Sequence, residues 1–222
     1  MSYNIYLHIR PETHLQFQNI RAKMNAGESE SLSKALGENL ADIACEIIDQ
    51  VFGRIARLSG SKDHESEKVI QQIVDTTRKY MPWSVSFFGN ERLLPMVNYL
   101  SNMTYEHEGD YYVRYPVEKS LVTELLGCVD QMKAGNHQYV KPALRAFTEV
   151  VDVGVNHLVR EPKKMLKFNM VVDKTLNGVI TLTTQLGYKR FDKLGHIYDA
   201  HTISHYFDHF LAFLEDEMVQ QA

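Results

Sequence analysis

Apolar side chains recur every three or four residues along most of the chain, the spacing that places them on one face of an α-helix. The clearest example covers residues 31–58, where a stripe is formed by Leu32, Leu36, Leu40, Ile43, Ile47, Val51 and Ile55. Neighbouring apolar positions at Ala44, Ile48 and Phe52 widen this stripe. Because a wide apolar face must be buried, we expect a central helix of a bundle here. A capping box at residues 29–32 is expected to begin it.

The same spacing recurs in seven further segments, which are residues 12–24, 65–80, 91–103, 117–134, 142–158, 162–183 and 199–218. Prolines mark several of their boundaries. Met81-Pro82 is expected to end one helix, and Pro142 and Pro162 are expected to lie in the first turns of two others. Asn90 is expected to cap the helix at 91–103.

Three segments are harder to assign. Residues 177–183 fit either a continued helix or a strand after an Asn-Gly turn, and we favour the helix because no obvious partner strand follows. Residues 187–195 are polar and are expected to form a loop. Residues 104–115 alternate aromatic and acidic side chains around Gly109-Asp110, a pattern typical of a hairpin with Tyr111, Val113 and Tyr115 on one face.

A strand is predicted at residues 3–9, where Tyr3, Ile5, Leu7 and Ile9 alternate with polar positions. It could pair with the hairpin at 104–115. We therefore predict a mostly α protein, a multi-helix, bundle-like single domain over residues 1–222 that includes a small β element. Residues 1–27 are expected to form a strand and a short helix packed on the bundle.

Composition and charge narrow the class of protein. The 222 residues are 44% hydrophobic and 23% charged, as in ordinary globular proteins. The net charge of −4 argues against a nucleic-acid partner, which usually selects a basic surface. No apolar run approaches the roughly 18 residues of a membrane span, so no membrane association is expected. The chain has two cysteines and neither belongs to a C-x-x-C motif, a pattern typical of proteins in a reducing compartment. We therefore expect a soluble cytoplasmic protein.

Motifs that would identify an enzyme are missing. The sequence has no phosphate-binding glycine loop and no G-x-S-x-G elbow, and neither H-E-x-x-H nor E-x-x-H occurs. Whether the protein is an enzyme is left open. The leading hypothesis is a binding or regulatory helical protein without catalytic chemistry of its own, acting with a protein partner or as a homo-oligomer. No cofactor is predicted for it.

One group of residues supports an alternative. His201, His205 and His209 follow each other at four-residue steps, with Asp208 beside the last. On a helical wheel they lie opposite the apolar face. Side chains four residues apart have Cβ atoms about 5–6 Å apart, so adjacent histidines can bind one metal ion such as zinc or iron. The alternative is a metal-binding protein or a metal-dependent enzyme that uses these four side chains as ligands. Two other interpretations of the same residues are a helix face in contact with water and a homodimer interface whose histidines change protonation with pH.

Overall fold

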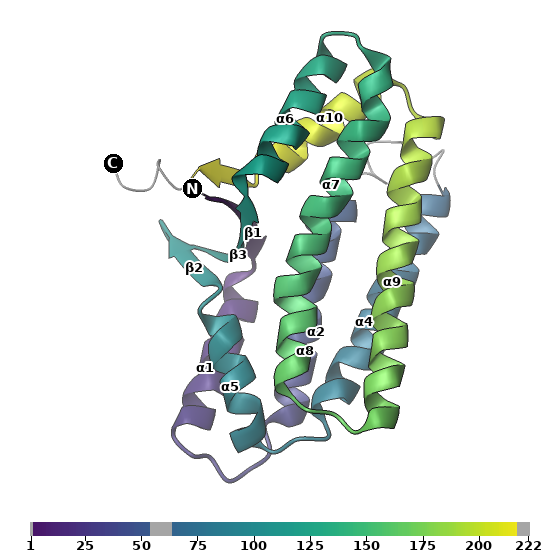
Figure 1. Cartoon of the computed structure of the whole chain (residues 1–222). Coiled ribbons are helices and arrows are strands. Elements are labelled where there is room, and N and C mark those ends of the chain that lie inside the picture. Colours follow the sequence, from purple (N-terminus) through teal and green to yellow (C-terminus); the bar gives the residue numbers. More distant parts are fainter. Residues whose placement is uncertain (1, 54–63, 217–222) are drawn as a thin grey trace.

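A computed structural model of the chain describes residues 2–53 and 64–216. Helices dominate these residues, and a small antiparallel sheet lies beside them (Figure 1), which confirms the predicted mostly α architecture with a β element. The α-helices are α1 (Pro11–Asn25), α2 (Ser33–Ile48), α4 (His64–Val85), α5 (Asn90–Ser101), α6 (Lys119–Lys133), α7 (Val140–Val155), α8 (Glu161–Met165), α9 (Met170–Ile197) and α10 (Ala200–Leu211). Two π-helical turns, η1 (Asp49–Gly53) and η4 (Asn156–Arg160), follow α2 and α7, and a 3-10 turn, η3 (His137–Tyr139), precedes α7.

The sheet contains β1 (Ser2–Ile9), β2 (Thr104–His107), β3 (Asp110–Glu118) and β4 (Leu214–Asp216) in the order β2-β3-β1-β4. The hairpin predicted at 104–115 is present, and β3 pairs with β1 so that Ile5 lies opposite Tyr115. The predicted final helix is too long, because α10 ends at Leu211 and the chain returns to pair with β1 as β4.

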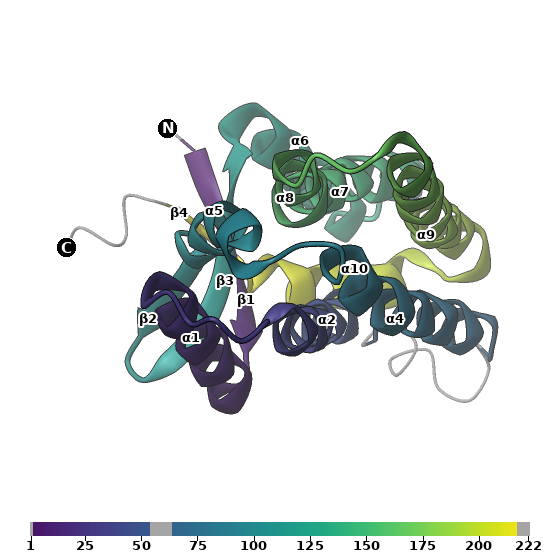
Figure 2. The same cartoon turned by 90° about the horizontal axis from the view of Figure 1, so that it is seen from below.

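Four long helices form the body of the molecule. Seen from one end, α2 and α4 lie side by side, and α7 and α9 face them across the interior (Figure 2). An aromatic cluster surrounds Phe147 of α7, which is fully buried. The rings of Phe191, Tyr206, Phe207 and Phe210 have their centroids 4.3–5.9 Å from that of Phe147. The side chains of Tyr206, Phe207 and Phe210 are therefore buried, and they join α10 to α7.

Close packing explains two wrong predictions about helix ends. Helix α4 continues through Pro82 to Val85, and α9 continues through residues 187–195 to Ile197. Pro82 approaches α2 so closely that a Cβ at Gly37 would lie 2.5 Å from its Cα. In α9, Gly187 is buried against Phe52, where a Cβ would lie 3.2 Å from the ring. Pro82, Gly37 and Gly187 therefore lie where two helices pack closely. These contacts outweigh the local preference of proline and glycine to end a helix.

The segment predicted as one helix from residue 162 is broken in two. Helix α8 ends at Met165, Lys167 has a left-handed φ of 46°, and α9 begins after Asn169. The Asn169 side chain accepts hydrogen bonds from the backbone N–H groups of Val171 and Val172 at 3.1 and 3.0 Å. Asn169 is therefore the N-cap of α9 rather than a residue inside one helix over 162–183. The predicted continuation of this helix through residues 177–183 is confirmed.

The predicted caps of two other helices are wrong. Asn90 is the first residue of α5, and its side chain instead accepts from the N–H of Leu32 at 2.9 Å and donates to the carbonyls of Glu28 and Glu30. Asn90 thus fixes the segment that precedes α2. Leu32 holds the N-cap position of α2 without a side-chain cap, so no capping box forms at 29–32. Residues 54–58, predicted to end this helix, lie outside the described residues.

Candidate functional site

The structure brings together two of the four predicted metal ligands. His201 and His205 are exposed on α10, with their Nε2 atoms 3.3 Å apart. Asp208 is exposed and forms an ion pair with Lys133 of α6. His209 is half-buried and its Nε2 lies 3.2 Å from the carbonyl oxygen of Gln50. Within residues 2–53 and 64–216, no cluster of three or more His, Cys, Asp or Glu side chains is placed to hold a metal ion.

His209 and Tyr206 of α10 both contact carbonyl groups of the π-helical turn η1. The carbonyl of Val51 accepts from the hydroxyl of Tyr206 at 2.9 Å, and that of Gln50 accepts from His209 in its Nε2-protonated form. Two side chains of α10 therefore anchor this helix to the end of α2. That role accounts for His209 without a metal.

The metal hypothesis stays a prediction, now reduced to a pair of ligands. We expect Zn²⁺ to bind the pair weakly and to raise the melting temperature only at high metal concentration, because two imidazoles leave a tetrahedral ion half-coordinated. His205→Ala should abolish this stabilisation in thermal scans, whereas Asp208→Asn should preserve it. Stoichiometric metal in tag-free protein, lost in both variants, would instead support the four-ligand centre.

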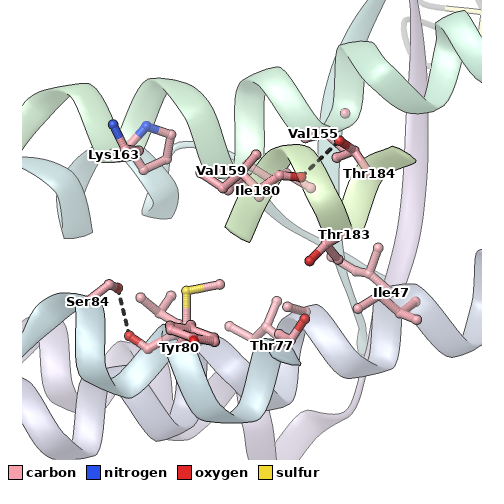
Figure 3. A pocket seen from close by; sticks show the side chains of 18 of the residues that line it. Ile47, Thr77, Tyr80, Ser84, Val155, Val159, Lys163, Ile180, Thr183 and Thr184 are labelled. Carbon is pink, nitrogen blue, oxygen red and sulfur yellow. Dashed lines mark hydrogen bonds between the residues drawn. The ribbon is translucent and has the colours of Figure 1, made fainter. Parts of the chain in front are cut away.

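A larger candidate site is a cavity of about 290 Å³ in the interior of the bundle (Figure 3). Two of its walls come from α2 and α4 and from α7, η4, α8 and α9, and residues of α1, α5, η1 and the sheet also line it. Most lining side chains are aliphatic, and many are only half-buried, among them Ile43, Ile47, Val155, Leu158, Val159, Val179 and Ile180. The cavity is therefore an apolar site between helices, a common location for small-molecule binding.

Three of the hydroxyl groups in the lining are bonded within their own helices. Thr77 donates to the carbonyl of Ile73 at 2.9 Å, and Thr184 donates to that of Ile180 at 2.9 Å. Ser84 likewise donates to the carbonyl of Met81 at 2.7 Å, and Figure 3 shows the bonds of Ser84 and Thr184. Because each hydroxyl proton is bound by the backbone of its own helix, these side chains offer a ligand little donor capacity.

One end of the cavity has a charged side chain in its lining. Within residues 2–53 and 64–216, Lys163 of α8 is the one charged residue that lines the cavity, and it lies across from Ser84 in Figure 3. Its side chain is only 13% exposed, and its Nζ is 2.5 Å from a carboxylate oxygen of Asp173. This hydrogen bond is the main reason that the pKa of the Asp173 carboxyl is lowered. The ammonium group also lies 5.9 Å from the centre of the Phe168 ring.

A hydrogen-bond network supports the wall on the α7–α9 side. Tyr188, which lines the cavity from α9, donates to Asp152 of α7 at 2.5 Å. The same carboxylate accepts two hydrogen bonds from Arg160, at 3.0 and 2.8 Å. The bonds from Arg160 contribute most to lowering the pKa of Asp152, while burial, followed by the bond to Asp152, raises the pKa of Tyr188. Because the bidentate pair fixes η4 against α7, it positions the Leu158 and Val159 portion of the lining.

Sequence reasoning missed this cavity because its walls belong to stripes that were predicted to be core. Ile43, Ile47 and Leu158 carry the same pattern whether they face a packed neighbour or an open space. One available signal was the presence of threonine in the predicted helix over 162–183, at Thr183, since a small side chain there fills less volume.

Comparisons with protein-family models, with curated proteins and with solved structures gave no match. Among the helices of the described residues, none combines the length and the apolar character needed to cross a bilayer.

Proposed function

We propose that this chain is a binding protein for an elongated apolar small molecule, held in the cavity between the α2–α4 and α7–α9 helix pairs. The observation that carries the proposal is the mostly aliphatic lining, in which side chains such as Ile47, Val155 and Ile180 remain half-buried and border the cavity. A ligand that covers them removes apolar surface from water, which stabilises the complex by about 25 cal/mol per Å².

The dimensions of the cavity define the ligand. Its volume of about 290 Å³ is roughly twice the ~150 Å³ of an apolar cavity that accepts benzene, which suits a molecule of about a dozen carbon atoms. The lining extends along α9 from Leu176 to Tyr188, a distance of ~18 Å at 1.5 Å per residue. A single extended chain fits this shape better than a fused ring system.

A substitution within the cavity tests the proposal. Thr183 lies beside Ile47 across the interior (Figure 3), so Thr183→Trp should occupy the space that the ligand needs. We expect the affinity for decanol, measured by isothermal titration calorimetry, to fall by about tenfold or more, equivalent to about 1.4 kcal/mol.

The matched control is Thr181→Trp, which places the same side chain at an exposed position on the same helix. It should bind decanol as the unmodified protein does. Circular dichroism should show equal helical content in both variants, and Val155→Phe provides a second cavity-filling change if Thr183→Trp does not fold. Equal decanol affinity in the cavity variants and the control, or no binding by the unmodified protein, would refute the proposal.

A cytoplasmic location and a protein partner or homo-oligomer remain predictions from the sequence. The partner prediction is supported by apolar side chains on the outer surface of α9, where Met170, Val171 and Leu182 are 73%, 74% and 66% exposed. A partner that covers such side chains would remove their surface from water.

A further inference from the structure

Lys163 allows the ligand class to be narrowed, on the basis of the function proposed above. Among the described residues of the mostly apolar lining, Lys163 alone carries a formal charge, and it lies at one end of the cavity in Figure 3. From this arrangement we infer that the ligand is a single-chain amphiphile with an anionic headgroup. The headgroup pairs with Lys163, and the chain extends along α9 towards Thr183.

Of the two residues in the Lys163–Asp173 ion pair, only Asp173 is exposed enough to turn away from its partner. The lysine side chain is 13% exposed, whereas that of Asp173 is 42% exposed. Asp173 also accepts a hydrogen bond at 2.9 Å from Asn177, one turn further along α9. The carboxylate can therefore turn outwards into water and keep a partner, while the ammonium group stays at the cavity. Its three N–H donors permit it to bind a second anion even while Asp173 remains.

Electrostatics favours an anion over other headgroups at this position. A neutral chain would leave Lys163 with Asp173 as its partner and would give the remaining N–H donors of the ammonium group no charged acceptor. A cationic headgroup would be repelled by Lys163. A carboxylate or phosphate monoester forms a charge-assisted hydrogen bond instead. Because the volume suits about a dozen carbon atoms, a lipid with two long chains is too large for the site.

The test compares ligands that share one alkyl chain and differ in headgroup. At neutral pH and below the concentrations at which they form micelles, we expect decanoate to bind the full chain about tenfold or more tightly than decanol. Lys163→Met should reduce that ratio to near one while decanol binding is retained. Lys164→Met is the matched control, since Lys164 is 66% exposed and pairs with Glu161 outside the cavity; it should leave the ratio unchanged.

A second variant keeps the inference testable if Lys163→Met does not fold. Asp173→Asn removes the competing carboxylate, so decanoate should bind about tenfold more tightly and decanol should not. Decyl phosphate distinguishes the source of the anion: binding at least as tight as that of decanoate supports a phosphate headgroup, and weaker binding supports a carboxylate. Decanoate no tighter than decanol, or decylamine tighter than decanoate, would overturn the inference and leave the proposed function intact. Failure of every decyl compound to bind would remove both.

Discussion

Phe147→Ala should lower the free energy of unfolding by about 3–5 kcal/mol. Phe147 is fully buried, and four aromatic rings from α9 and α10 surround it. Alanine would leave a void that these rings cannot fill, because each is held by its own helix. Since natural proteins are stable by only about 5–15 kcal/mol, this single change removes a large share of the total.

Urea denaturation followed by circular dichroism measures the effect. Phe87→Ala provides the control, because Phe87 is 49% exposed and should cost less than about 1 kcal/mol. The comparison also tests the position of α10, whose residues Tyr206, Phe207 and Phe210 form most of the cluster. Similar losses for the two variants would contradict the packing of α10 against α7.

The helices could be predicted because burial and sequence period are directly linked. In α7, which lies in the segment predicted as a helix at 142–158, the apolar residues Leu144, Phe147 and Val151 recur at helical spacing and all three are buried. The same holds for Ile203 and Phe207 of α10. An apolar stripe at helical spacing has only one way to leave water, and this is why the fold class follows from the pattern.

Helix boundaries were predicted less well because they depend on contacts between segments far apart in the chain. Asn90 resembles a helix cap, but its side chain holds the backbone at residues 28–32. Pro82 and Gly187 resemble helix ends, but each lies where another helix approaches closely. Nothing within a few residues of these positions encodes the distant partner, so local propensity gave the wrong answer.

The two candidate sites differ in what a sequence can reveal. The histidines of α10 attract attention because their spacing is local, yet His209 and Asp208 have other partners. The cavity forms where the apolar faces of neighbouring helices do not contact each other. The spacing of apolar residues along the chain does not specify where this happens. Ile47 and Leu144 occupy equivalent positions in their patterns, but Leu144 is packed in the core whereas Ile47 is half-buried and lines the cavity.

Gly37→Ala should destabilise the protein by about 1–3 kcal/mol, the usual cost of overpacking. Alanine favours helix formation over glycine by about 1 kcal/mol, so local propensity alone predicts the opposite sign. The reason is the contact between α2 and α4, where a Cβ at Gly37 would lie 2.5 Å from the Pro82 Cα and 2.8 Å from a methyl group of Val85. Relief of the first contact requires movement of backbone, since no rotation of a side chain can provide it.

Gly178→Ala on α9 is the matched control, since Gly178 is exposed and a Cβ there has no neighbour within 4 Å. This change should stabilise the protein by about 0.5–1 kcal/mol, so the two substitutions are expected to have opposite signs in urea denaturation. Gly37→Ala should also weaken decanol binding, because α2 and α4 form one wall of the cavity and the new methyl group pushes them apart. If both alanines stabilise the protein to the same extent, α2 and α4 do not meet at Pro82, and that wall of the cavity is placed incorrectly.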